Sequence, residues 1–314
     1  MTTDLPLVTA LINTYNYARY LPFAINSVLA QTYPNIEIVV VDDGSTDHTS
    51  SVLAQYGERV RAIRTVNGGQ GHAFNLGFTA ARGELIMMLD ADDMWLPEKV
   101  ERMVEFASEN PEAALMYHRH QNVDEKGNEI GTPQPLPLIN GDYRNRFLRS
   151  GGTWWSPVTS VIALRADHVR KMLPLPTYAV REGADTVVTD CCVLTSKLAS
   201  IPDALTLRLL HGSNLYAAGR DDMTYRTKAI READVRRIEW RVFSLAQIMA
   251  RFGQKLELDL ERNGWRMINL YWLGRASFLK MARACLLSPE HSISWRWSRL
   301  KWVMATKKLY AGER

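Results

Sequence analysis

Acidic and amide side chains gather where short apolar segments of this 314-residue chain end. The residues concerned are Asn13 and Tyr15, then Asp42 and Asp43, and later Asp90, Ala91, Asp92 and Asp93. Carboxylates brought close together repel one another, unless a divalent cation lies among them or some are protonated. The Asp-Ala-Asp spacing also places two side chains on one side of an extended strand. These residues therefore predict a Mg²⁺ or Mn²⁺ site that is completed by substrate phosphates.

The same aspartates fit a second interpretation, in which they form turns and cap helices. Asp followed by Gly-Ser, or placed shortly before Pro97, is ordinary turn chemistry. Turn chemistry explains any single aspartate well, but it is a weaker account of two clusters that each follow an apolar strand. We therefore take both clusters as candidates for binding and catalysis.

The elements that would position these side chains alternate between strands and helices. Near-continuous apolar runs predict strands at 8–13, 36–42, 60–65, 84–90 and 113–118, with helices between them at 21–31, 46–55, 71–81 and 97–110. This alternation indicates an α/β fold with a mostly parallel sheet covered by helices. Ligands bind at the carboxyl ends of such strands, where the polar clusters lie.

The rest of the chain predicts loops and then a helical part. Prolines between 133 and 176 indicate long loops, followed by a helix at 185–199 and a strand at 205–210. From about Ala217 the chain is rich in Arg and Trp and lacks Pro until Pro289, which predicts two or three helical segments. We expect a catalytic domain at 1–217 and a helical C-terminal module at 218–314.

Several motifs resemble those of a known family. The run VTALINTYNYARYLPFAINSVLAQTYPNIEIVVVDDGSTDHT, followed by NGGQGHAFNLGFTAARGELIMMLDADD, is similar in order and spacing to family 2 of the inverting glycosyltransferases. Weaker similarity lies in ADT at 184–186 and LRLLHGSN at 207–214. The resemblance implies a Rossmann-like GT-A fold and transfer of a sugar from a nucleotide diphosphate donor to an acceptor hydroxyl.

The resemblance also implies roles for the matched residues. Asn13, Tyr15, Asp42 and Asp43 would hold the nucleoside, with Asp43 accepting the imide proton of a uracil-type base, so a UDP-sugar is favoured. Asn13 stands where many relatives carry Pro or Thr. Asn67, Gly69 and Asn75 would lie below the sugar diphosphate, since glycines permit close backbone approach, and the side chains of Asn67 and Asn75 would be either structural or donor-facing. Asp90 and Ala91 would face the ribose or the metal, Asp92 would bind the metal, and His211 would complete the metal shell or bind the diphosphate.

An inverting transfer needs a base that removes the acceptor proton. The resemblance assigns this role to Asp185, by its distance from HGSN, or to Asp190, which matches another acidic pattern of the family that lacks its first acid here. We prefer Asp185, whose alternative role is to cap a helix. His211 likewise has a structural alternative, as a hydrogen-bonded core histidine.

Composition restricts the partners. A formal net charge of +4 is too small to indicate a nucleic-acid binder. Three cysteines, two of them adjacent, favour a reducing cytoplasm, and we expect neither a signal peptide nor a spanning helix. Helical stretches at 265–287 and 293–310 fit peripheral contact with the inner face of the cytoplasmic membrane, or packing on the protein. The side chains expected to meet lipid are Arg266, Arg275, Arg283, Arg296, Arg299, Lys301, Lys307, Lys308, Trp295, Trp297 and Trp302.

The acceptor expected from the resemblance is a saccharide or a lipid-linked saccharide, in synthesis of a bacterial surface or extracellular polysaccharide. Two other functions fit parts of the pattern. One is a catalytically silent scaffold that binds sugar nucleotides. The other is a nucleotidyltransferase, although no basic glycine-rich triphosphate loop lies near the first strand.

Overall fold

A computed structural model of the chain describes residues 5–135, 138–177, 181–212 and 228–287, together with residues 297, 300, 301 and 303. These residues form two compact units. The first lies within Met1–Asp142 and Ser156–Asn214, and the second within Tyr143–Trp155 and Leu215–Arg314. The short segment Tyr143–Trp155 thus groups with the C-terminal helices. The division into functional domains at residue 217 stays a prediction.

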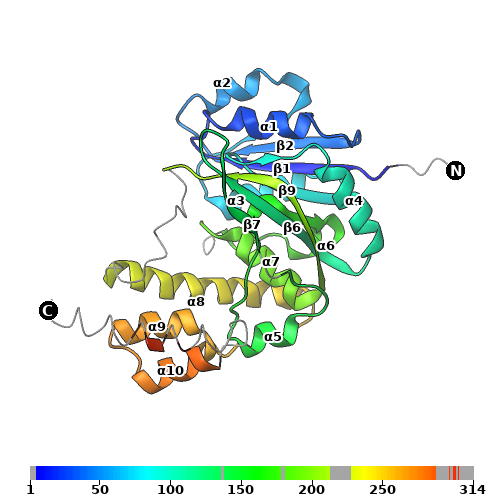
Figure 1. The fold of residues 1–314 in the computed structure, drawn as a ribbon. Helices are drawn as coiled ribbons and strands as arrows, with labels where there is room; N and C mark the ends of the chain where they lie inside the picture. Colours follow the sequence, from blue (N-terminus) through cyan, green and yellow to red (C-terminus); the bar gives the residue numbers. More distant parts are fainter. Residues whose placement is uncertain are drawn as a thin grey trace. The chain divides into compact units, whose positions relative to one another are not determined.

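The first unit contains, within the described residues, a nine-stranded sheet in the order β3-β2-β1-β4-β8-β6-β9-β5, with β7 paired to β6 (Figure 1). The strands are β1 (Val8–Thr14), β2 (Ile36–Asp42), β3 (Arg61–Arg64), β4 (Leu85–Asp90), β5 (Met94–Trp95), β6 (Ala113–Val123), β7 (Glu129–Gln134), β8 (Ile162–Arg165) and β9 (Lys197–Leu209). Strands β3, β2, β1 and β4 are parallel, whereas β8 runs antiparallel to both β4 and β6. The parallel part matches the predicted α/β fold.

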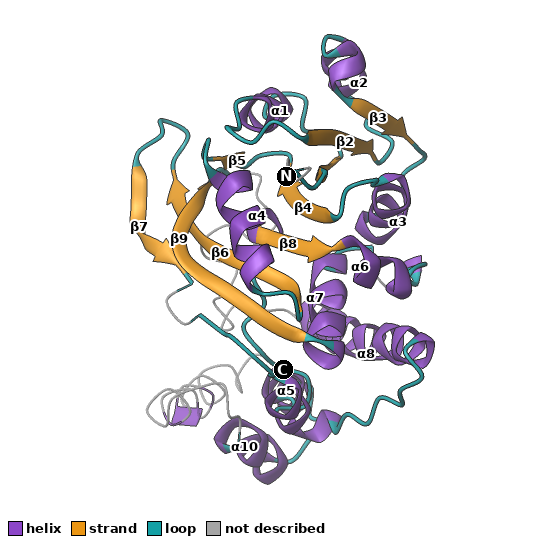
Figure 2. Ribbon diagram, turned by 90° about the vertical axis from the view of Figure 1, so that its right-hand side faces the viewer, coloured by secondary structure: helices purple, strands orange, loops and turns teal. Residues whose placement is uncertain are grey.

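Helices cover both faces of this sheet (Figure 2). They are α1 (Leu21–Leu29), α2 (Thr49–Ala54), α3 (Gln70–Ala80), α4 (Lys99–Glu109), α6 (Ala166–Met172) and α7 (Ala184–Thr195), with short 3-10 helices η1 (Gly57–Arg59) and η2 (Thr159–Val161). Helices α1 and α4 share one core with the sheet. Helices α3, α6 and α7 contact one another on the opposite face.

The alternation of side chains along β1 produces these two layers. Ala10 and Ile12 belong to the core shared with α1 and α4, while Leu11, between them, faces α3. Gly77 permits α3 to lie close to the sheet, because a Cβ added there would come within 2.4 Å of Leu11 Cδ1. The close approach fixes the position of the glycine-rich segment that begins α3.

The second unit is helical in its described residues: α5 (Arg144–Arg149), α8 (Lys228–Arg251), η5 (Leu260–Arg262), α9 (Gly264–Trp272) and α10 (Phe278–Leu286). Helices α9 and α10 pack through a core that includes Met267 and Met281. Arg231 of α8 is buried, lies 4.4 Å from the centre of the Trp272 ring and donates to Asn269 Oδ1 at 3.3 Å. The buried guanidinium joins α8 to α9.

Most predicted elements are confirmed, and the differences occur where pairing extends a strand. The predicted helix at 185–199 is wrong at its end, since α7 stops at Thr195 and β9 begins at Lys197. Strand β6 continues to Val123 because its polar second half pairs with β9. Strands β5, β7 and β8 and helices α5 and α6 were not predicted. The predicted segment 265–287 is two helices, separated at Gly274, whose φ is 72°.

The cysteines and the helix lengths can be compared with the sequence-based expectations for the described residues. Cys191, Cys192 and Cys285 are buried and form no disulfide. No helix in the described ranges is both long enough and apolar enough to cross a bilayer. Most of the predicted helix at 293–310 lies outside the described residues.

Candidate active site

The carboxyl ends of β1, β2 and β4 lie at one edge of the sheet. In the strand register, Asn13 of β1 is the partner of Asp90 in β4, and Thr14 is the partner of Asp42 in β2. The structure therefore brings the start of both acidic clusters to the same edge, as the sequence predicts for a parallel sheet.

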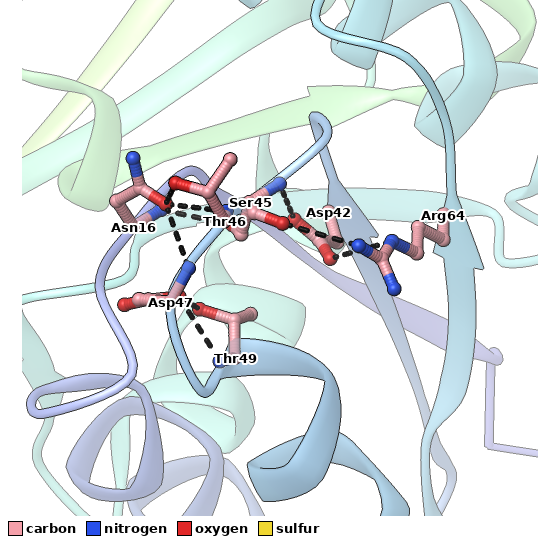
Figure 3. Close-up of polar contacts among 7 residues, drawn as sticks. All are labelled: Asn16, Asp42, Ser45, Thr46, Asp47, Thr49 and Arg64. Atoms are coloured by element: carbon pink, nitrogen blue, oxygen red, sulfur yellow. Dashed lines mark hydrogen bonds and ion pairs between the residues drawn. The ribbon is translucent and has the colours of Figure 1, made fainter.

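The turns after β1 and β2 are held together by side chain to backbone hydrogen bonds (Figure 3). Asn16, with φ of 59°, accepts at Oδ1 from the Thr46 amide at 2.7 Å, and its own amide donates to Ser45 Oγ at 2.9 Å. Asp42 is fully buried; its Oδ1 accepts from the Ser45 amide at 2.8 Å, and its Oδ2 lies 3.7 Å from Arg64 Nε. Asp42 thus shapes the turn.

Asn13 differs from these residues because its polar atoms are not satisfied. Its Nδ2 and Oδ1 are buried and have no hydrogen-bond partner among the described residues. Buried amides in folded proteins are almost always paired. Close by in the sequence, Tyr15 is 44% exposed. Both residues lie at the end of β1. The Asn13 amide is suited to bond the polar edge of a base, and the Tyr15 ring is suited to stack on its flat face.

Asp43 connects the end of β2 to the glycine-rich segment before α3. Its Oδ1 accepts from the Gly68 amide and its Oδ2 from the Gly69 amide, both at 2.8 Å. Gly69 has φ of 86°, and a Cβ there would lie 2.7 Å from Arg181 Cα. Only glycine fits this position without strain. Asp43 therefore fixes the backbone that the resemblance places below the diphosphate.

The two asparagines of the glycine-rich segment make structural contacts. Asn67 Oδ1 accepts from Arg181 Nη2 at 2.7 Å. Asn75 bonds both backbone groups of one residue: its Nδ2 donates to Leu175 O at 2.9 Å, and its Oδ1 accepts from the Leu175 amide at 2.7 Å. Of the two roles considered for these side chains, the geometry supports the structural one.

The aspartates after β4 form a cluster of strongly interacting charges. Burial raises the pKa of Asp90 well above its usual range, and the charges of Asp93, Asp92 and Asp185 raise it further. Burial also raises the pKa of Asp93 to about 7, with a further contribution from Asp92. The guanidinium of Arg208 lowers the pKa of both Asp90 and Asp93. Such a concentration of carboxylates favours the binding of a cation.

His211 lies beside the second aspartate of the motif. Its Nε2 is 3.0 Å from Asp92 Oδ2, and its side chain is 1% exposed, compared with 13% for Asp92. Tyr20 stacks on the imidazole with ring centres 4.4 Å apart, and Tyr17 approaches it edge-on at 6.1 Å. The sequence-predicted pair of metal ligands is thus brought together by two tyrosines that sequence reasoning did not select.

Asp185 lies in the first turn of α7, whose N-cap is Gly183 in the left-handed conformation, so Asp185 is not the cap itself. Its Oδ1 accepts from the Thr186 amide at 2.8 Å and its Oδ2 from Thr159 Oγ1 at 3.1 Å. Burial raises the pKa of Asp185, and these hydrogen bonds oppose the rise. The charge of Asp185 also raises the pKa of Asp90, whereas Asp190 is a buried residue in the middle of α7. The geometry favours Asp185 over Asp190.

Three residues at the site were given no role from the sequence. Thr159 and Ser160 lie in η2, within a region of irregular composition, and Arg208 lies near the end of β9, in the segment LRLLHGSN that was matched for its histidine. These residues reach the site because β8 pairs with β4 and β9 pairs with β6.

Comparison with known proteins agrees with this geometry. The profile of glycosyl transferase family 2 matches residues 9–170. An uncharacterized glycosyltransferase of Nostoc sp. (strain PCC 7120) is 36% identical over 263 residues, which cover 82% of this chain and 80% of that protein. The chondroitin synthase of Escherichia coli is 34% identical over 138 residues, which cover 43% of this chain and 20% of that protein.

Two solved structures share the fold. TarS of S. aureus, in complex with UDP, superposes with a TM-score of 0.58 at 17% identity, over 98% of this chain and 93% of that one. A mannosyltransferase of Pyrobaculum calidifontis, in complex with GDP-Man and Mn²⁺, gives a TM-score of 0.54 at 18% identity, over 98% of this chain and 87% of that one.

The sheet and its two helical layers define the GT-A fold. The profile match over half of the chain and the similarity to the Nostoc protein make the assignment more specific. The chain belongs to glycosyl transferase family 2.

Proposed function

We propose that this protein is an inverting, divalent-metal-dependent glycosyltransferase that takes a sugar from a nucleoside diphosphate, UDP being favoured. The acceptor is a hydroxyl of a saccharide or a lipid-linked saccharide in the assembly of a bacterial surface or extracellular polysaccharide. The observation that carries the proposal is the cluster of Asp90, Asp92, Asp93 and Asp185 at the end of β4, where burial raises the pKa of Asp90 and the charges of the other three raise it further.

The donor atoms fit a divalent cation. Two adjacent ligands of an octahedral Mg²⁺, each about 2.1 Å from the ion, lie about 3 Å from one another. Asp92 Oδ2 and His211 Nε2 are 3.0 Å apart. No group of three His, Cys, Asp or Glu side chains with metal-binding geometry occurs in the described part of the chain. Two protein ligands and the diphosphate oxygens are the arrangement that such ions commonly adopt.

Each residue then has a chemical task. Asp92 and His211 would hold the ion, which would supply positive charge to neutralise the leaving diphosphate. Asn13 and Tyr15 contact the nucleoside, and Asp43 keeps the glycine-rich backbone in place beneath the diphosphate. Asp185 removes the proton of the acceptor hydroxyl as its oxygen attacks the anomeric carbon.

A thermal-shift panel tests the donor class. UDP, GDP, dTDP, CDP and ADP are each added with and without MnCl₂, because a ligand that binds the native state raises Tm. We expect UDP with Mn²⁺ to give the largest rise, on the order of several degrees at a concentration 100 times Kd. Equal shifts with and without Mn²⁺ would contradict the metal assignment, and no shift with any nucleotide would favour a silent scaffold.

The helical unit supports a contact with anionic lipid. On α10, Leu279 (77% exposed), Arg283 and Leu287 (57% exposed) are spaced four residues apart, so they share one face. Trp297 and Lys301 are also exposed. Three other cations form ion pairs within the unit: Arg266 with Glu239, Arg275 with Glu232 and Lys280 with Glu261. We therefore place the proposed lipid contact on the α10 face, and a role of Arg266 and Arg275 in it stays a prediction.

Vesicle flotation tests this contact. The protein should float with phosphatidylglycerol vesicles and remain below with phosphatidylcholine vesicles. The double substitution Leu279→Asp and Leu287→Asp should reduce the floated fraction several-fold. Each change places a charge where an apolar side chain would enter the lipid. Ile130→Asp, at a half-exposed position in the first unit, is the matched control. Equal flotation of wild type and the double variant would exclude the α10 face.

A further inference from the structure

The 3-10 helix η2 lies between the two halves of the site. Strand β8 follows η2 and pairs antiparallel with β4, with Met87 opposite Ala163. Continued toward the end of β4, this register places Ser160 opposite Asp90. Thr159 and Ser160 are buried, with 5% and 0% of their surface exposed. Two adjacent buried hydroxyls thus lie where the aspartate motif ends.

Each hydroxyl bonds a different half of the site. Ser160 Oγ accepts from the Asp90 amide at 3.0 Å and donates to Asp93 Oδ2 at 2.6 Å, so it fixes both sides of Asp92. Thr159 Oγ1 donates to Asp185 Oδ2 at 3.1 Å. The residue that contacts the aspartate motif, Ser160, is therefore adjacent in sequence to the residue that contacts the candidate catalytic base, Thr159.

The backbone of η2 is itself held by a buried lysine. Lys99 Nζ, fully buried, donates to Ser160 O at 2.6 Å, and Thr206 Oγ1 donates to the same oxygen at 3.1 Å. The Lys99 amino group also lies 4.0 Å from the centre of the Trp95 ring. Because the carbonyl oxygen has two donors from α4 and β9, η2 has little freedom to move.

We propose that Thr159 and Ser160 are positioning residues that set the distance between the base Asp185 and the motif Asp90–Asp93. This inference rests on the proposed function. Ser160 orients the residues that bind the diphosphate and the ion, and Thr159 orients the carboxylate that receives the acceptor proton. The two hydroxyls consequently affect different steps of the reaction.

The test separates donor binding from turnover. Donor binding is the Kd of the nucleoside diphosphate that the panel selects, measured by calorimetry with MnCl₂. Turnover is the release of that nucleotide from its hexose and N-acetylhexosamine conjugates, with water as the acceptor. Ser160→Ala should raise Kd roughly tenfold. Thr159→Val should leave Kd unchanged and lower kcat roughly tenfold, and Thr159→Ser, which restores the hydroxyl, should recover most of that loss.

The control is Ser244→Ala, since Ser244 is a buried serine of the second unit whose hydroxyl donates to the Trp240 carbonyl of its own helix. Its effect on Tm measures what the loss of a buried hydroxyl does to stability alone. If Thr159→Val keeps the kcat of wild type and Asp185→Asn is inactive, the inference is overturned but the proposed function stands. If Asp185→Asn is also fully active, the base assignment fails and the inference fails with it. Equal loss of binding and turnover in both variants would indicate general structural damage and overturn it as well.

Discussion

Asp185→Asn is expected to lower kcat by about 10²- to 10⁴-fold, the range that a positioned general base contributes. The amide has nearly the shape of the carboxylate but cannot accept a proton. The Thr186 amide, which now donates to Asp185 Oδ1, can still donate to the amide oxygen, and the Thr159 hydroxyl, which now donates to Oδ2, can turn to accept from the amide nitrogen. We therefore expect a folded protein whose Kd for the nucleoside diphosphate with Mn²⁺ equals that of wild type.

The pH profile gives an independent measurement of the same group. Burial raises the pKa of Asp185 above that of an ordinary carboxyl. A base works only when it is deprotonated, so kcat should fall as the pH is lowered through this raised pKa, at a higher pH than for an exposed aspartate. Asp190→Asn serves as the comparison. Loss of turnover in Asp190→Asn, with retention in Asp185→Asn, would transfer the role of base to Asp190.

Asp92→Ala is expected to abolish the Mn²⁺-dependent part of nucleotide binding and to lower turnover by about 10³-fold. The physical reason is the loss of a ligand to the ion, whose stabilisation of a departing diphosphate is worth several kcal/mol. The substitution also removes the partner of His211 Nε2, so the remaining ligand loses its orientation. Calorimetry with and without MnCl₂, together with nucleotide release from the donor sugar, measures both effects.

Asp167→Ala provides the matched control for Asp92→Ala. Asp167 is an exposed aspartate in the first turn of α6, which follows β8 beside the start of β4 and so lies away from the carboxyl ends of β1, β2 and β4. It should leave both Mn²⁺-dependent binding and turnover within about twofold of wild type. Persistence of the Mn²⁺ effect in Asp92→Ala would show that the ion is held elsewhere and would remove the support for His211 as its second ligand.

The parallel part of the fold could be predicted because β1, β2 and β4 are buried over most of their length and read as near-continuous apolar runs. The strand at 36–42 is confirmed at both ends, and the helices between the parallel strands begin and end within a few residues of their predicted positions. Strand β8 and the second half of β6 could not be predicted, because they depend on pairing with distant strands. The GT-A assignment followed from motifs in the predictable part.

Some residues of the candidate site could be selected from the sequence and others could not. Asp90, Asp92 and His211 could be selected, since acids at a strand end and a motif after β9 leave a sequence signature. Asp42 shows the limit of such reasoning, because the same signature also marks a buried residue that shapes a turn. Tyr20 and Ser160 had no signature, since their contacts to His211 and Asp93 join positions far apart in the chain.

The contact between the glycine-rich segment and the residues before α7 has a consequence for recombining this protein with its relatives. Gln70 donates from its amide to Arg181 O at 2.8 Å, and its side chain accepts from the Ala184 amide at 2.8 Å. A chimera that exchanges only one of these segments would set Gly69 against a foreign backbone at a separation that tolerates no Cβ. Residues 67–70 and 181–184 therefore need to be exchanged together in any chimera of this protein with a relative.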